Sequence, residues 1–99
     1  MRRYRFEREV RTPFSEAYNI FLGERKIGRI DLHFAPDSVY GGLWVIEDMT
    51  LDEIRELREE IDEELVMSAD SMREDFVLCV YQGREVGVFT DTEESPFSL

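Results

Sequence analysis

Three polar side chains at alternate positions, Arg29, Asp31 and His33, form the pattern in this sequence that most suggests chemistry. Alternate residues of a β-strand point to the same side, about 7 Å apart, so the three side chains would share one face. A carboxylate beside an imidazole orients the ring, and both groups also bind metal ions. A metal site normally needs three or four ligands, however, and His33 is the single histidine of the chain. We therefore treat the three residues as a candidate polar cluster and predict no catalytic, metal or cofactor-binding residue.

Two further patterns resemble reactive or nucleotide-binding sites but lack the neighbours that such sites need. Residues 23–28 have the glycine spacing of a phosphate-binding loop, yet Arg29 and Ile30 follow where the loop requires Lys and then Ser or Thr. Cys79, the single cysteine, lies in the apolar run 76–81, which favours a buried structural thiol over a nucleophile. We therefore expect a protein without enzymatic activity and without a cofactor.

The charge of the chain is strongly acidic and unevenly distributed. Its net value at pH 7 is −11, to which residues 1–29 contribute +4 and residues 30–99 contribute −15. An acidic body repels nucleic-acid phosphates, so we expect no nucleic acid partner. The longest wholly apolar run has six residues, against roughly 20 for a membrane-spanning helix. We accordingly expect no membrane partner and a cytoplasmic location.

Six stretches have the alternation or composition of β-strands. The first alternates, with Tyr4, Phe6, Arg8 and Val10 on one side and only charged residues on the other. Glutamates among its arginines weaken a phosphate-binding track, so we interpret the charged side as a solvated face whose arginines pair with carboxylates. Gly41 and Gly42, inside the fourth stretch, suggest a bulge or a sharp bend. The stretches are residues 3–11, 18–22, 27–34, 39–47, 76–81 and 86–90.

A single amphipathic helix is the most clearly marked element. Thr50, followed by Glu53 three positions later, forms the sequence of a capping box. Apolar residues then recur at helical spacing to about residue 67, and acidic residues cover most of the remaining surface. We interpret that acidic surface as a solvated face supported by two pairs along the helix, Arg55 with Glu59 and Arg58 with Asp62.

The order of these elements, β-β-β-β-α-β-β, predicts a single α+β domain over residues 1–92. We expect an antiparallel, strongly bent or barrel-like sheet of about six strands, with the acidic helix packed on it. Gly83 and Arg84 have the pattern of a two-residue hairpin turn between the last two strands. Residues 93–99 lack periodicity and are expected to form a mobile tail.

Apolar surface exceeds what this helix covers. A helix about 10 Å wide covers roughly two strands, whereas the fourth and fifth stretches are apolar on both faces. Either the sheet closes into a barrel or a second copy covers the open side. We favour a homodimer or small homo-oligomer, with Trp44 at or near the contact.

The segment PDSVYGGLWV, followed by EDMTLDEIRELREEIDEEL, resembles the strand and helix of HicB-type antitoxin domains over about a third of the chain. The link Pro-Asp-Leu-Pro-Gly-Cys of that family is absent, and Glu47 here runs almost directly into the helix. The resemblance implies an acidic regulator that masks a basic partner or a nucleic-acid-binding protein. From the residues themselves we predict a non-catalytic self-associating or protein-binding module, and the antitoxin-like regulator is the alternative.

Overall fold

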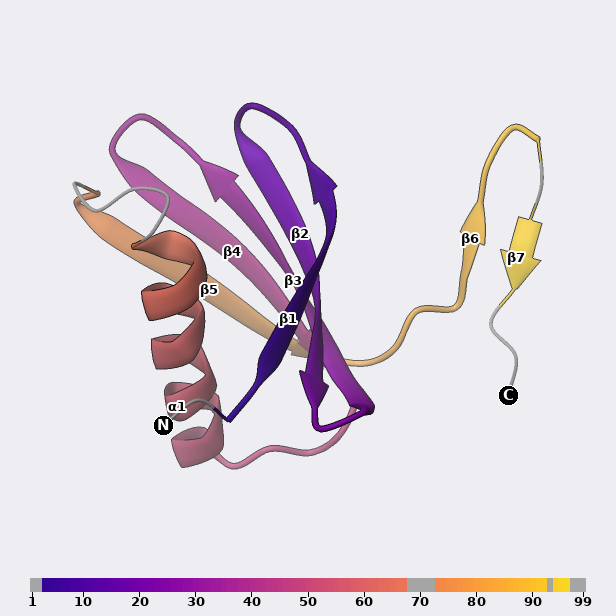
Figure 1. Ribbon diagram of the computed structural model, residues 1–99, viewed down its shortest axis with the longest axis horizontal. Helices are drawn as coiled ribbons and strands as arrows, with labels where there is room; N and C mark the ends of the chain where they lie inside the picture. Colours follow the sequence, from indigo (N-terminus) through magenta and orange to yellow (C-terminus); the bar gives the residue numbers. More distant parts are fainter. Residues whose placement is uncertain (1–2, 68–72, 93, 97–99) are drawn as a thin grey trace.

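The chain forms a mixed β-sheet with a helix on one side and a separate small β-hairpin (Figure 1). The computed structural model describes residues 3–67, 73–92 and 94–96. In chain order the elements are β1 (Arg5–Arg11), β2 (Ser15–Leu22), β3 (Arg25–Phe34), β4 (Ser38–Val45), α1 (Leu51–Ile61), the π-helical turn η1 (Asp62–Val66), β5 (Asp75–Gln82), β6 (Gly87–Phe89) and β7 (Glu94–Pro96).

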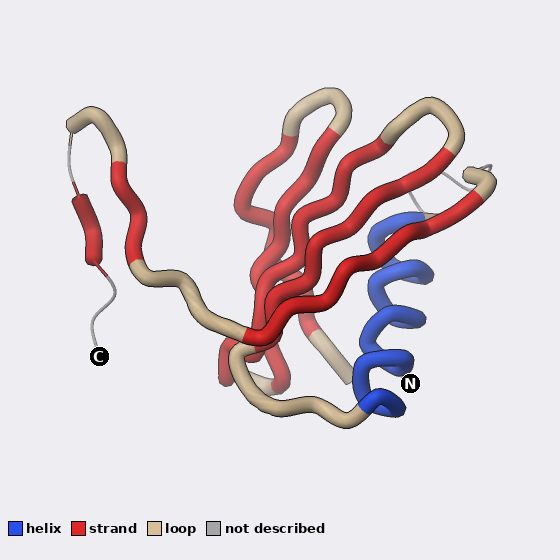
Figure 2. The backbone as a smooth tube through the Cα atoms, turned by 180° about the vertical axis from the view of Figure 1, so that it is seen from behind, coloured by secondary structure: helices blue, strands red, loops and turns tan. Residues whose placement is uncertain are grey.

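The main sheet has five strands in the order β1-β2-β3-β4-β5. The strands β1 to β4 are joined by short turns and pair antiparallel. β5 pairs parallel with β4, because α1 crosses one side of the sheet and returns the chain to the end where β4 begins (Figure 2). The predicted α+β class is therefore confirmed, whereas the prediction of an antiparallel, barrel-like sheet of six strands is wrong. The sheet is mixed and open, with β1 and β5 at its edges.

The sixth predicted strand does not join the main sheet. In place of the hairpin turn expected at Gly83 and Arg84, the chain runs on beyond β5, and β6 pairs with β7. The Gly83 N–H donates to the Val45 carbonyl oxygen at 2.9 Å, which prolongs the β4–β5 ladder where a turn would otherwise begin. β7 lies within the segment predicted to be a mobile tail, and residues 93 and 97–99 lie outside the described part of the chain.

One hydrophobic core fills the space between the sheet and the helix. Alternate residues of β2, β3 and β4 point toward α1 and η1, which close the core from one side. Full burial of such a side chain contributes about 1.5–3 kcal/mol. The largest fully buried side chains are Ile20, Ile30, Leu32, Val39, Leu43, Leu57, Ile61 and Val66. The other side of the sheet, here called the open face, has no helix over it in the described residues (Figure 2).

The strands bulge at Glu9 and Ile27, not at the predicted Gly41 and Gly42. The β1–β2 pairing skips Glu9 and the β2–β3 pairing skips Ile27. β4 pairs in continuous register with both of its neighbours. The bulge at Glu9 also reverses the alternation of β1, so that Val10, expected on the core side, is exposed.

The paired glycines provide room for neighbouring side chains. A Cβ atom on Gly41 would lie 2.9 Å from Leu78 Cδ1, on the side of the core. A Cβ atom on Gly42 would lie 2.9 Å from the ring of Trp44, on the open face. The two glycines therefore allow close packing on both sides of a regular strand.

Thr50 and Glu53 form the predicted capping box at the start of α1. The Glu53 N–H donates to Thr50 Oγ1 at 3.1 Å, and the Thr50 N–H donates to Glu53 Oε1 at 2.9 Å. The hydrogen bond from the Thr50 backbone N–H to the Glu53 carboxylate, and after it the Thr50 side chain, hold the pKa of Glu53 below its ordinary value. The capping box thus satisfies N–H groups that have no partner within the helix.

After Ile61 the helix widens into the π-helical turn η1, which ends with the Met67 N–H donating to the Asp62 carbonyl oxygen at 2.7 Å. A π-turn inserts one residue into the helical repeat. Leu65 and Val66, adjacent in sequence, are both buried as a result. None of the helices in the described part of the chain is long and apolar enough to cross a lipid bilayer.

Part of the acidic helix surface binds the beginning of the chain. Glu60 Oε1 accepts hydrogen bonds from the backbone N–H groups of Arg3 and Tyr4, both at 2.9 Å. Glu56 forms an ion pair with Arg3 at 3.4 Å. These carboxylates attach the segment before β1 to the helix. The Arg3–Glu56 ion pair agrees with the prediction that arginines of the first stretch pair with carboxylates.

Neither of the two predicted pairs along the helix forms, and three of the four side chains contact other groups instead. Arg55 lies 3.2 Å from Asp52, Asp62 lies 2.5 Å from Arg73, and Arg58 donates to the Phe76 carbonyl oxygen at 2.8 Å. Two of these three contacts connect the helix to β5 or to the segment before it.

Candidate functional site

The residues of the predicted polar cluster lie along β3 on the open face, but the structure joins only two of them. Arg29 Nε lies 3.2 Å from Asp31 Oδ1. His33 is exposed near the end of β3, opposite Tyr40, with no hydrogen bond to either cluster residue. Within residues 3–67, 73–92 and 94–96, no group of three His, Cys, Asp or Glu side chains is placed to hold a metal ion.

Arg29 instead belongs to a polar network with Glu9, Asn19 and Asp31. The Arg29 guanidinium lies 2.8 Å from Glu9 Oε2, and Asn19 Nδ2 donates to the same oxygen at 2.8 Å. The Asn19 hydrogen bond and the Arg29 contacts hold the pKa of Glu9 below its ordinary value. Glu9 is thus kept ionised, which suits an ion pair and not a group that exchanges protons near neutral pH.

Next to this network, exposed apolar side chains of β4 and β5 form a continuous surface, here called the aromatic face. Its members are Tyr40, Trp44, Val77 and Tyr81, which are 49%, 39%, 39% and 50% exposed. The parallel register sets Tyr40 beside Val77 and Trp44 beside Tyr81. The Trp44 and Tyr81 rings stack, with centroids 5.2 Å apart and planes inclined by 21°.

The position of the Trp44 ring depends on Gly42. The ring covers the place where a side chain at Gly42 would stand, because a Cβ atom there would lie 2.9–3.0 Å from the ring carbons. With the Trp44 ring lying over Gly42, Trp44 and Tyr81 present an apolar surface that remains exposed. Such large, exposed and rigid aromatic side chains are typical of protein contact surfaces.

Cys79 also lies on β5 and is exposed, so the prediction of a buried thiol is wrong. Its strand is apolar on both sides, but α1 covers only the side that carries Phe76. Cys79 points to the open face, where its partner in the register is Gly42. Sequence reasoning missed this exposure because both sides of the strand have the composition of a core.

Sequence reasoning also missed the association of Trp44 with Tyr81. The available signal was the helix between the fourth and fifth strands, since a crossover of this length normally joins parallel neighbours. Parallel pairing of the two apolar strands would have set their aromatic side chains side by side.

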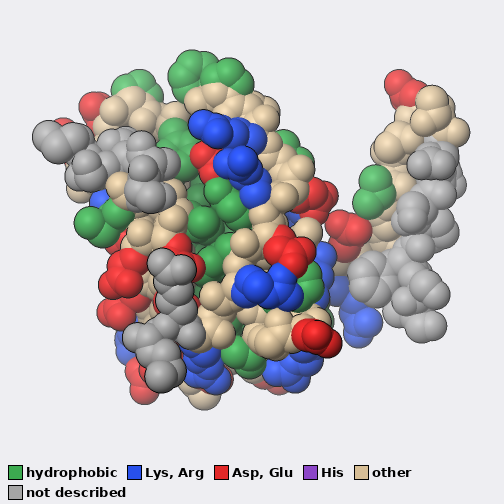
Figure 3. Space-filling model, in the orientation of Figure 1, with side chains coloured by type: hydrophobic (Ala, Val, Ile, Leu, Met, Phe, Trp, Pro, Cys, Tyr) green, Lys and Arg blue, Asp and Glu red, His purple; other side chains and the backbone are tan. Residues whose placement is uncertain are grey.

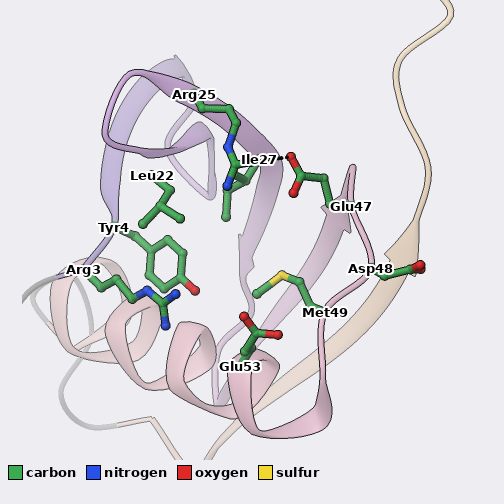
Figure 4. A pocket seen from close by; sticks show the side chains of 9 residues that line it. All are labelled: Arg3, Tyr4, Leu22, Arg25, Ile27, Glu47, Asp48, Met49 and Glu53. Carbon is green, nitrogen blue, oxygen red and sulfur yellow. Dashed lines mark ion pairs between the residues drawn. The ribbon is translucent and has the colours of Figure 1, made fainter.

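A small hollow lies at the beginning of α1, between that helix, β3 and the segment before β1 (Figure 4). Its volume of about 50 Å³ has room for a few water molecules, whereas small-molecule sites measure roughly 300–1,000 Å³. The Arg25–Glu47 ion pair, at 3.1 Å, lies at this hollow, and Glu53 is already engaged in the capping box. We therefore assign no ligand to the hollow.

Comparison of the chain with protein-family models, with curated proteins and with solved structures finds no match in any of the three.

Proposed function

We propose that this protein is a non-catalytic, self-associating module that uses its aromatic face as the contact surface. The observation that carries the proposal is the stacked pair of Trp44 and Tyr81, which remains exposed on the side of the sheet opposite the helix. Trp and Tyr are the residue types most enriched at the centres of protein interfaces. Their burial on association would stabilise the complex by about 25 cal/mol for each Å² of apolar surface removed from water.

The neighbouring polar network supports this proposal. Glu9, Arg29 and Asp31 already form ion pairs within the chain, so they would border a contact without leaving an unpaired charge at it. An apolar centre beside a polar rim is the usual composition of a protein interface.

The alternative, an acidic regulator that masks a basic partner, has less support. Glu53, Glu56, Glu60 and Asp62 all make hydrogen bonds or ion pairs within the chain. These carboxylates stabilise the fold, which reduces the free negative charge that the helix offers to a basic protein.

Light scattering after size-exclusion chromatography, at tens of micromolar, tests the proposal. One chain has a mass of 11.7 kDa. We expect light scattering to give the mass of two chains for the wild type and of one chain for Trp44→Ser. Phe14→Ser is the matched control, because Phe14 is a 73% exposed aromatic residue outside the aromatic face. A Trp44→Ser protein with the wild-type oligomeric mass, or a monomeric wild type, would refute the proposed function.

A further inference from the structure

The segment after β5, residues 83–92 and 94–96, has no hydrophobic core of its own; it is here called the arm. Val86, Val88 and Phe89 are 76%, 50% and 62% exposed. The arm contains only two strands of three residues each, β6 and β7, paired with one another. An isolated two-stranded hairpin is marginally stable in water, so a hairpin with exposed apolar side chains needs a surface on which to pack.

The arm stands clear of the sheet in its own chain. In the ribbon and tube views the helix and the arm lie on opposite sides of the sheet, and the space-filling view shows the arm projecting from the body (Figures 1, 2 and 3). The radius of gyration is 14.1 Å, against about 13 Å for a compact domain of 100 residues. The arm is thus attached to the domain through residues 83–86 but does not pack on it.

The aromatic face and the arm are complementary in composition. On the face, Trp44, Tyr81 and their neighbours are exposed. On the arm, three apolar side chains are exposed and have no surface to pack on. α1 packs against the other side of the sheet, so it cannot fill this role. The arm carries three of the six large hydrophobic side chains that are exposed outside the main sheet in the described residues.

We infer that two copies of this chain exchange arms, the arm of each copy packing on the aromatic face of the other. This inference rests on the proposed function and names the occupant of the aromatic face. β5 ends at Gln82, next to Tyr81 at the border of the face, and the chain then continues away from the domain. A tight reversal there would lay β6 along the edge of β5 and not over Trp44. In a dimer with two-fold symmetry, the arm reaches the face of the other copy without such a reversal. Each chain then buries its arm and has its own aromatic face covered.

The first experiment removes the apolar side chains of the arm and leaves the face intact. In the variant V86S/V88S/F89S we expect the mass from light scattering to fall from two chains to one. Trp44, the single tryptophan, reports on the face, and its fluorescence should shift to longer wavelength as the face becomes exposed to water. The body of the variant should keep its far-ultraviolet circular dichroism, because the three residues take no part in the core.

The outcomes separate the arm exchange from the proposed function. If the arm variant stays dimeric while Trp44→Ser is monomeric, the face still mediates association, but the arm exchange is wrong. If both variants keep the wild-type mass, the proposed function fails as well. Phe14→Ser again serves as the control for the loss of an exposed aromatic side chain.

A second experiment uses the native Cys79 on the open face as a cross-linking partner. In the variant V88C, oxidation by diamide, which takes up the two thiol hydrogens, should join Val88→Cys of one chain to Cys79 of the other. We expect a species of two chains on a non-reducing gel, and its loss when C79S is added to V88C. An intramolecular disulfide, recognised by faster migration at the mass of one chain, would show that the arm packs on its own face and would overturn the exchange. The absence of any V88C cross-link in a chain that is dimeric would overturn it also.

Discussion

At the scale of single residues, glycines determine how closely the strands approach one another beneath the aromatic face. A Cβ atom on Gly28 would lie 2.3 Å from the backbone oxygen of Trp44, a separation that real atoms do not adopt. β3 and β4 therefore need glycine at this point, because only glycine lets the Trp44 backbone lie so close to β3. Gly42 has the same role for the Trp44 ring on the open face.

We expect Gly28→Ala to lower the free energy of unfolding by about 2–3 kcal/mol, because backbone and not a flexible side chain must move to admit the methyl group. Denaturant melts measure the effect. Gly83→Ala is the matched control, since nothing lies within 4 Å of a Cβ atom there and its midpoint should change little. If both variants lose the same free energy of unfolding, the close approach of β3 and β4 at Gly28 is not the cause of the destabilisation.

At the scale of elements, the helix was predicted correctly, whereas the partners of β5 and β6 were missed. The capping box is a local signal, because Thr50 and Glu53 lie within one turn and their hydrogen bonds need no distant residue. Gly83 and Arg84 are equally local, yet the Gly83 N–H bonds to Val45, far back in the sequence, and the predicted turn is lost. Trp44 was singled out from composition, whereas its stacking on Tyr81 required knowledge of the parallel register.

The contribution of the capping box is measurable. We expect Thr50→Ala to lower the free energy of unfolding by about 1 kcal/mol, because the Glu53 N–H loses its acceptor at the start of α1. Thr50→Ser retains a hydroxyl group and should stay within a few tenths of a kcal/mol of the wild type. Chemical denaturation of the three proteins supplies the comparison, and identical midpoints for Ala and Ser would show that the box contributes nothing.

At the scale of the whole molecule, charge opposes the association that the aromatic face favours. Each chain carries a net charge of −11, so two copies repel one another, and the contact between them depends on burial of apolar surface. The polar network beside the aromatic face is internally paired and adds no attraction between copies.

Salt should therefore strengthen self-association. Raising the salt concentration from about 0.01 M to about 0.1 M shortens the screening length from about 30 Å to about 10 Å, which weakens the repulsion. We expect the dimer dissociation constant, measured by sedimentation equilibrium, to fall over this range. A contact between the acidic helix and a basic protein would respond in the opposite direction, so a dissociation constant that rises with salt would contradict the apolar contact.

The parallel pairing of β5 with β4 has a consequence for how the chain reaches its native state. The meander of β1 to β4 forms from neighbours in sequence, whereas β5 enters the sheet only after α1 has crossed over it. Contacts that close a long loop form late, since the entropy of closure must be overcome before they stabilise the chain. During refolding β4 is therefore a temporary edge, with its hydrogen-bonding groups on one side unpaired. At high protein concentration the strand of another molecule can occupy that edge before β5 arrives, so dilution should improve the refolding yield.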